Sequence, residues 1–221
     1  MAGSMTYEPA PLLGIGDVPV DRPIVTLDID GVLNAYDSDR GPSPWVPPCE
    51  PLPVPYGLDR REDVRIPDEM CEEYGRRPGA TLTITWSTAL MGDLADLADG
   101  LGVTVLWLTS WNRFAGFLAS TRFWPGGGSP AIGHIDVNRG GTCGSAAGKA
   151  IAIEELCARL TDAHPGGDVP PLVSFDDDAP WDALLWGRPA NPLPGFFHGI
   201  RTEPAWGITM SQMAGLIDIV G

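Results

Sequence analysis

The sequence predicts an α/β fold in which a mostly parallel sheet carries helices on both faces. Three continuous apolar runs, at about 23–28, 103–108 and 171–175, have the composition of strands that are buried on both sides. Segments with apolar residues at helical spacing lie between and after these runs. Because strands that alternate with helices join through crossover connections, the three strands are expected to run parallel in one sheet.

Local patterns predict the remaining elements. Thr81–Trp86 is β-branched and alternating, which indicates a short strand. Thr88 is a suitable cap for a helix over about 89–100, along which leucines recur at helical spacing, and Gly102 is placed to end it. Further helices are expected at about 112–120, 146–160 and 209–220, and a short strand within about 131–137.

A long insert follows the first predicted strand. Residues 36–79 are rich in proline, hold six arginines and show few periodic apolar positions, so little regular structure is expected beyond a helical turn near 67–74. A loop of this length inside a compact domain is usually functional, and we expect a minimal cap or lid. Residues 1–20 carry proline and glycine without periodicity and are expected to form a flexible lead-in, which leaves 21–221 as a single core domain.

The composition excludes several classes of function. A net charge of −15, from 14 basic and 29 acidic residues, argues against a general affinity for nucleic acid or for anionic membranes. We find neither a run long enough to span a membrane nor a basic-then-apolar leader. The four cysteines show no Cys-x-x-Cys spacing, so free thiols in a reducing cytoplasm are expected.

Two acids at the end of the first predicted strand are the most informative feature. Asp28 and Asp30 stand one residue apart and are followed by Gly31. Neighbouring anions at the end of a buried strand repel one another and are poorly solvated, so they need a cation or a developing charge to face. The alternative is an ordinary polar exit into a turn, since Asp and Gly are common turn residues.

The rest of the chain favours a functional site over a turn. Ligands of open parallel sheets bind beyond the carboxyl ends of the strands, where polar groups follow all three apolar runs. Only one of the 14 basic residues is a lysine, and it stands near the start of the helix before the last of these strands. The residues expected to converge are Asp28, Asp30, Thr109, Ser110, Lys149, Asp176, Asp177 and Asp178.

This set of side chains suits phosphoryl chemistry. Several carboxylates without a His/Cys cluster favour a hard cation such as Mg²⁺. Asp28 can act both as a metal ligand and as a nucleophile, and Asp30 as general acid and then general base. Thr109 and the amide of Ser110 would bind phosphoryl oxygens, while Lys149 would balance the negative charge.

More acids than a single metal site needs are candidates for metal ligands. The candidates are Asp28, Asp30, Asp176 and Asp177. Asp178 and Asp182 form an alternative Asp-x-x-x-Asp pair, or they cap the helix that follows. Asn112 is a further candidate for substrate binding. Trp107, Trp111, Trp181 and Trp186 are interpreted as packing residues, with stacking on a base or sugar as the alternative.

In this order, the motifs resemble those of the haloacid dehalogenase (HAD) superfamily of phosphohydrolases. The matching elements are Leu-Asp-Ile-Asp-Gly-Val at 27–32, Leu-Trp-Leu-Thr-Ser at 106–110, Lys149 and Phe-Asp-Asp at 175–177. A closer likeness is to small actinobacterial and phage-type HAD proteins related to the phosphatase domains of RNA-repair proteins. The likeness covers the segments that end the three predicted strands, 28–34, 106–112 and 175–178. It also includes the sequence Gly-Ile-Thr at 207–209, before the last predicted helix.

The resemblance implies a HAD-like Rossmannoid fold with its insert where this superfamily places its first type of cap. It also implies a Mg²⁺-dependent phosphomonoester hydrolase that forms an aspartyl-phosphate on Asp28, with a small phosphorylated metabolite or nucleotide as substrate. A polynucleotide end-phosphatase and a catalytically silent binding module are the alternatives. A dehalogenase is disfavoured, because its chemistry requires neither Asp30 nor the metal-binding acids.

Overall fold

The strand Ile24–Leu27 (β1) forms the centre of the sheet because it can be buried completely. All four of its residues are inaccessible to solvent. Its one polar side chain, Thr26, hydrogen-bonds through its hydroxyl to the hydroxyl of Ser174 on a neighbouring strand (2.8 Å), so no polar group is left unpaired there. The computed structural model describes residues 9–36, 54–125, 128–137, 146–181 and 193–221.

Five parallel strands make up the main sheet, in the order β5-β4-β1-β6-β7. The three strands predicted from apolar runs occupy its centre, and the predicted short strand lies at one edge. The strand at the other edge was not predicted, because its residues are mostly half-exposed and lack an apolar run. The flanking strands are β4 (Thr104–Trp107), β5 (Ala131–His134), β6 (Leu172–Asp176) and β7 (Phe197–Arg201).

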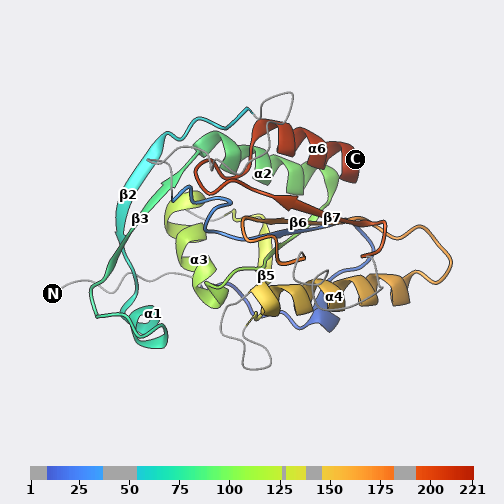
Figure 1. The fold of residues 1–221 in the computed structure, drawn as a ribbon, viewed down its shortest axis with the longest axis horizontal. Helices are drawn as coiled ribbons and strands as arrows, with labels where there is room; N and C mark the ends of the chain where they lie inside the picture. Colours follow the sequence, from blue (N-terminus) through green and yellow to red (C-terminus); the bar gives the residue numbers. More distant parts are fainter. Residues whose placement is uncertain (1–8, 37–53, 126–127, 138–145, 182–192) are drawn as a thin grey trace.

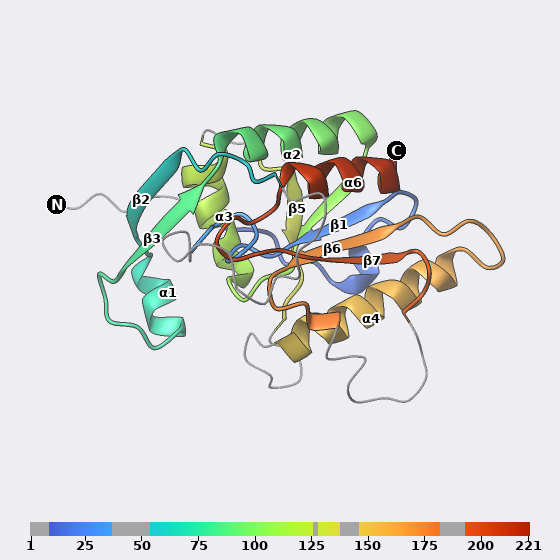
Figure 2. The same ribbon diagram turned by 45° about the horizontal axis from the view of Figure 1, so that its top comes forward.

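Helices cover both faces of this sheet, as predicted. Figures 1 and 2 show α2 (Thr88–Leu101) and α6 (Met210–Val220) on one face and α4 (Ala146–Ala163) on the other. Leu27 of β1 belongs to the apolar core under α2 and α6, whereas Ile24 belongs to the core under α4. The fold is therefore an α/β sandwich of the Rossmann-like kind.

The helix boundaries follow local capping chemistry. Ser87, rather than the expected Thr88, caps α2 by accepting a hydrogen bond from the Leu90 amide, and Gly102 ends the helix in a left-handed conformation. Thr209 and Gln212 form a capping box at the start of α6. The helix predicted at 112–120 is present as three short consecutive turns: η2 (Asn112–Phe114), α3 (Ala115–Leu118) and η3 (Ala119–Phe123).

The insert after β1 contains more regular structure than the sequence suggested. Arg60–Arg65 (β2) pairs antiparallel with Thr81–Trp86 (β3), and we call this pair the ribbon. The short strand predicted at 81–86 is thus present as β3, but it lies outside the five-stranded parallel sheet. The strand β2 was not predicted from sequence, because five of its six residues are exposed and only Val64 is buried. The expected helical turn is confirmed as α1 (Asp68–Glu73).

The lead-in packs on the domain from residue 9 onward, so the expectation of a flexible segment is wrong for residues 9–20. The Leu13 amide donates to the His134 carbonyl (2.9 Å), and the His134 amide donates to the Pro11 carbonyl (2.8 Å). These bonds extend the sheet beyond β5. The segment continues through η1 (Ile15–Asp17) to Val18, which is completely buried.

Two expectations from composition concern membranes and thiols. None of the helices in the described part of the chain combines the length and the apolar character that crossing a bilayer requires. Cys71 and Cys157 are buried free thiols, in agreement with the prediction. Cys49 and Cys143 lie outside the described residues.

Gly207 allows the loop after β1 to pack against the chain segment that leads into α6. Its φ is +68°, and a Cβ at this position would overlap the carbonyl oxygen of Val32. We predict that Gly207→Ala lowers the free energy of unfolding by about 2 kcal/mol or more. Gly92→Ala is the matched control, since this α2 glycine has open space around it, and it should raise stability by about 0.5–1 kcal/mol. Equal urea midpoints for the two variants would contradict this expectation.

Candidate active site

The carboxyl ends of β1, β4 and β6 bring the predicted polar groups to one edge of the sheet. Asp28 directly follows β1, Thr109 lies two residues after β4, and Asp176 is the last residue of β6. Backbone bonds hold these ends in register, because the Asp28 amide donates to the Phe175 carbonyl (3.1 Å) and the Leu108 amide donates to the Leu27 carbonyl (2.9 Å). The structure therefore places Asp28, Thr109 and Asp176 at the same edge of the sheet.

Lys149 joins two of these acids. It lies in the first turn of α4, is 3% exposed, and places its ammonium Nζ 2.5 Å from Asp28 Oδ2 and 2.7 Å from Asp176 Oδ2. Both carboxylates are also buried. The lone lysine of the chain therefore forms the centre of a buried ion triad, which is a strongly coupled arrangement in a region of low dielectric constant.

Burial and charge shift the protonation of all three groups. Burial raises the pKa of Asp28, and the Lys149 ammonium opposes that rise. Burial and the neighbouring Asp28 charge raise the pKa of Asp176 to about 7. Burial alone would lower the pKa of Lys149, but its two carboxylate partners outweigh burial and raise it, so the ammonium stays charged.

Asp177 adds a third carboxylate. One oxygen from each of Asp28, Asp176 and Asp177 lies within 4.8 Å of the others. The Tyr36 hydroxyl donates to Asp177 Oδ2 (2.9 Å), and burial raises the pKa of Asp177 to about 6. When ionised, the three acids carry two more negative charges than Lys149 can balance. A divalent cation with oxygen preference fits this donor set in both charge and chemistry.

The glycine after Asp30 is required by this arrangement. Gly31 has φ +71°, and a Cβ there would overlap the Asp177 side chain. The hydroxyl of Thr202 donates to the Gly31 carbonyl (2.7 Å), which fixes the turn from the opposite side. The Asp-x-Asp-Gly sequence is thus a tight turn and also part of the acidic site, which unites the two alternatives considered for it.

Asp30 is not among the carboxylates that the described residues bring together. Its Oδ1 accepts a hydrogen bond from Asn34 Nδ2 (2.8 Å), and its Oδ2 accepts one from Trp111 Nε1 (2.9 Å). The geometry therefore separates Asp30 from the cluster of Asp28, Asp176 and Asp177. Trp111 was interpreted from sequence as a packing residue, and only its position directly after Ser110 pointed to the site.

The loop after β4 holds Thr109 against the first acid. Thr109 is completely buried, and its hydroxyl hydrogen-bonds to Asp28 and accepts from the Trp111 amide (3.3 Å). Asn112, a predicted substrate-binding residue, has a left-handed backbone (φ 47°) and accepts through Oδ1 from the Val137 amide (3.3 Å). Its oxygen is therefore committed to shaping the loop.

A residue of the insert also reaches this loop. The Tyr74 hydroxyl, at the C-terminal end of α1, donates to the Ser110 carbonyl (2.6 Å). Asn112 hydrogen-bonds to the same hydroxyl. The Tyr74 ring packs edge-on against Phe114, with centroids 6.1 Å apart. No feature of the sequence indicated Tyr74, because its role depends on where the insert folds.

Of the alternative acid pair, Asp178 and Asp182, only Asp178 belongs to the described residues. Asp178 is exposed, and its amide donates to Asp176 Oδ1 (2.9 Å), so its backbone orients the metal-site candidate. The described acidic cluster contains Asp176 and Asp177 and not Asp178. Asp182 and Trp186 lie outside the described residues.

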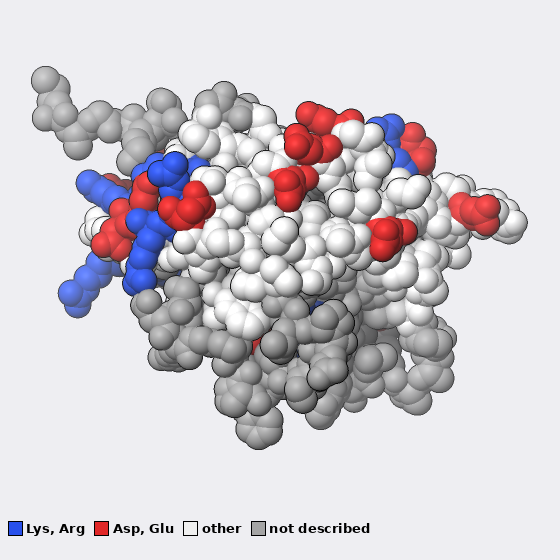
Figure 3. All heavy atoms as spheres, turned by 90° about the horizontal axis from the view of Figure 1, so that it is seen from above, with Lys and Arg blue, Asp and Glu red and all other residues white. Residues whose placement is uncertain are grey.

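The arginines of the insert are interleaved with acids. Figure 3 shows basic and acidic side chains gathered together at the end of the molecule that carries the ribbon. The described ion pairs at this end are Arg60–Asp59 (4.0 Å), Arg65–Asp68 (3.1 Å), Arg113–Glu73 (3.0 Å) and Arg122–Glu62 (3.0 Å). Because acids neutralise these four arginines, they are poor contacts for a nucleic-acid backbone.

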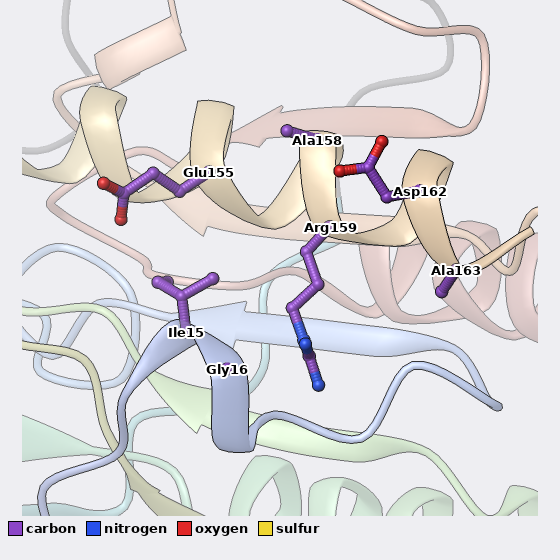
Figure 4. Close-up of a pocket in the computed structure, with 7 residues that line it drawn as sticks. All are labelled: Ile15, Gly16, Glu155, Ala158, Arg159, Asp162 and Ala163. Atoms are coloured by element: carbon purple, nitrogen blue, oxygen red, sulfur yellow. The ribbon is translucent and has the colours of Figure 1, made fainter.

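An open groove lies away from this site, between η1 and α4. Figure 4 shows Arg159 extending from α4 toward η1, with Glu155 and Asp162 on the same helix. The Arg159 guanidinium donates to the Val18 carbonyl (3.0 and 3.3 Å), so its charge ties the lead-in to α4. The groove lies toward the end of α4 opposite to Lys149. The residues that line it include no buried group of acids and lysine like the one at the strand ends.

Comparisons with models of protein families, with curated proteins and with solved structures give no match to this chain. What the protein does must therefore be inferred from its own residues. The most distinctive of these are the buried triad of Lys149, Asp28 and Asp176 and the Asp177 carboxylate beside it.

We predict that Asp177→Asn stabilises the metal-free protein progressively more as the pH rises from 4 to 7. The folded-state pKa of about 6 lies above the ordinary value of 3.8, so wild type loses stability as this carboxyl ionises across that window, and the amide removes the loss. Added Mg²⁺ should raise the Tm of wild type more than that of the variant, because it binds the ionised form.

Asp168→Asn is the matched control for this experiment, since Asp168 is an exposed acid in the loop that leads into β6, away from the carboxyl edge of the sheet. It should leave both the pH dependence and the Mg²⁺-induced shift in Tm close to those of wild type. If Asp177→Asn also left both unchanged, a cation site at this cluster would be excluded.

Proposed function

We propose that this chain is a Mg²⁺-dependent phosphomonoester hydrolase of the HAD superfamily that works through an aspartyl-phosphate on Asp28. The observation that carries the proposal is the setting of the Asp28 carboxylate. Its Oδ1 accepts from the Ile29 amide (2.7 Å) and its Oδ2 from Lys149 (2.5 Å), at the edge where three strands end. A buried carboxylate held by fixed donors among further acids has a geometry suited to nucleophilic attack.

The covalent step uses Asp28 as the nucleophile. One carboxylate oxygen forms a bond to phosphorus while the bond from phosphorus to the ester oxygen breaks, and the leaving oxygen takes up a proton. Water then attacks the phosphorus of the aspartyl-phosphate, which releases phosphate and restores the carboxylate. Lys149 reduces the repulsion between Asp28 and the incoming anion, because its ammonium lies against that carboxylate.

Asp28, Asp176 and Asp177 would hold the cation. When bound, the cation would supply positive charge that offsets the negative charge of the phosphoryl oxygens. The chain itself contributes the orientation of these acids. Asp176 is fixed by Lys149 and by the Asp178 amide, and Asp177 by Tyr36 and the turn at Gly31.

Asp30 is suited to proton transfer because its carboxylate lies apart from the acidic cluster. In the first half-reaction it would donate a proton to the leaving oxygen, and in the second it would accept one from the attacking water. Thr109, whose hydroxyl contacts Asp28, would bind a phosphoryl oxygen once substrate is present.

The charge distribution supports a small substrate over a polynucleotide end. The net charge is −15, and the described arginines near the ribbon are largely paired with acids. A silent binding module is disfavoured because Asp28, Asp30, Thr109 and Lys149 are all present, and both Thr109 and Lys149 contact Asp28. A small phosphorylated metabolite or nucleotide is therefore the proposed substrate class.

We expect wild type to hydrolyse p-nitrophenyl phosphate with Mg²⁺ and to lose activity when the metal is chelated. Asp28→Asn should lower kcat by at least about 10³-fold, since an amide is a very poor nucleophile. Asp168→Asn, which changes an exposed acid in the loop that leads into β6, serves as the control and should retain activity. Absence of hydrolysis by wild type with Mg²⁺, Mn²⁺ and Co²⁺ would overturn the proposed function.

The substrate class has a separate test. Mononucleotides and a panel of small phosphate esters should be hydrolysed with kcat/KM values higher than those for 3′-phosphorylated oligonucleotides. The reason is that the chain carries a net charge of −15 and that four described arginines near the ribbon are already paired with acids. Activity confined to the oligonucleotides would instead establish the end-phosphatase alternative.

A further inference from the structure

The carboxylate of Asp30 is held at both oxygens by side chains from two different loops. Asn34 Nδ2 donates to Oδ1 (2.8 Å) from the same loop, and Trp111 Nε1 donates to Oδ2 (2.9 Å) from the loop after β4. Two donors on the two oxygens of one carboxylate fix its rotation as well as its position. Asp30 is thereby oriented independently of the acidic cluster that contains Asp28.

Both donors are themselves fixed. Asn34 is 1% exposed, and its Oδ1 accepts from the amide of Thr85 on β3 (2.9 Å). That bond determines which end of the amide faces Asp30, because the oxygen must meet the N–H donor and the NH₂ group the carboxylate. Trp111 is 5% exposed, and its backbone amide donates to the Thr109 hydroxyl (3.3 Å).

The ribbon and α1 support the two donors. Asn34 is bonded to Thr85 of the ribbon, where the Ala35 amide also donates to the Thr85 carbonyl (2.8 Å). Trp111 follows Ser110, whose carbonyl accepts the Tyr74 hydroxyl at the end of α1 (2.6 Å). The ribbon is therefore connected to Asp30 through Asn34, and α1 is connected to it through Ser110 and the adjoining Trp111.

We propose that Asn34 and Trp111 are positioning residues that hold Asp30 in the orientation for proton transfer to the leaving group, with Asn34 making this orientation depend on the ribbon. This inference rests on the proposed function. Proton transfer requires the carboxylate to lie within hydrogen-bond reach of the leaving oxygen, and a misplacement of about 1 Å can cost about 10²-fold in rate. A singly held carboxylate could rotate away from that oxygen.

The leaving group provides a selective readout. A nitrophenolate leaves readily without a proton, whereas an alkoxide leaves only when it is protonated. General acid catalysis typically contributes about 10²–10⁴-fold, so its loss falls mainly on alkyl phosphates. A purely structural defect would instead slow both kinds of ester to a similar extent, because both use Asp28 and Lys149 alike.

The test compares Trp111→Phe with Trp124→Phe on p-nitrophenyl phosphate and on glycerol phosphate. Trp124 is a matched control, since it is also buried (8% exposed) and its Nε1 also donates one hydrogen bond, to the Met91 carbonyl (3.0 Å). Trp111→Phe should lower kcat on glycerol phosphate by about 10–100-fold and on p-nitrophenyl phosphate by less than about threefold. Trp124→Phe should show no such selectivity.

Asn34→Ala supplies an independent second variant and should show the same selectivity, even if Trp111→Phe proves too unstable to assay. Equal losses on the two esters in the folded variants, with wild type active on both, would overturn the positioning role alone. If wild type hydrolysed neither ester, the proposed function and this inference would both be overturned.

Discussion

A single buried ammonium organises the carboxyl edge of the sheet. Lys149 reaches from α4 to the ends of two adjacent strands, β1 and β6, and both of its carboxylate partners are buried with it. Removing one member of such a group leaves unpaired buried charge, which typically costs about 3–5 kcal/mol. The triad therefore fixes the first turn of α4 over the sheet. It also provides the positive and negative charges that a phosphate ester and a cation would contact.

The loop that follows β1 is the second constraint, because distant parts of the chain hold it from several sides. Thr202 binds the Gly31 carbonyl, Ile208 binds the Val32 carbonyl, and Thr85 binds both Ala35 and Asn34. These contacts come from the chain segment before α6 and from the ribbon. A rigid loop of this kind suits the proposed reaction, in which Asp28 and Asp30, one residue apart, would take different roles.

The success of prediction from sequence depended on burial. The central strands were predictable because each is a continuous apolar run, and the helices because the apolar stripe of each one faces one of the two cores. The strand β2 was not predictable, since an antiparallel ribbon with one buried side chain, Val64, has no apolar period to detect. The edge strand β7 was missed for a related reason, and its Gly199 is present because Trp181 packs where a side chain would lie.

The sequence by itself determined the chemical groups of the site: polar residues after three apolar runs, and one lysine in the whole chain. Only the tertiary structure decided how they divide, with Asp177 joining Asp28 and Asp176 while Asp30 pairs with Asn34 and Trp111. The physical reason is that such contacts are non-local. Trp111 is 81 residues from Asp30, and the Thr85 amide that orients Asn34 is 51 residues away from it, so no local pattern encodes either bond.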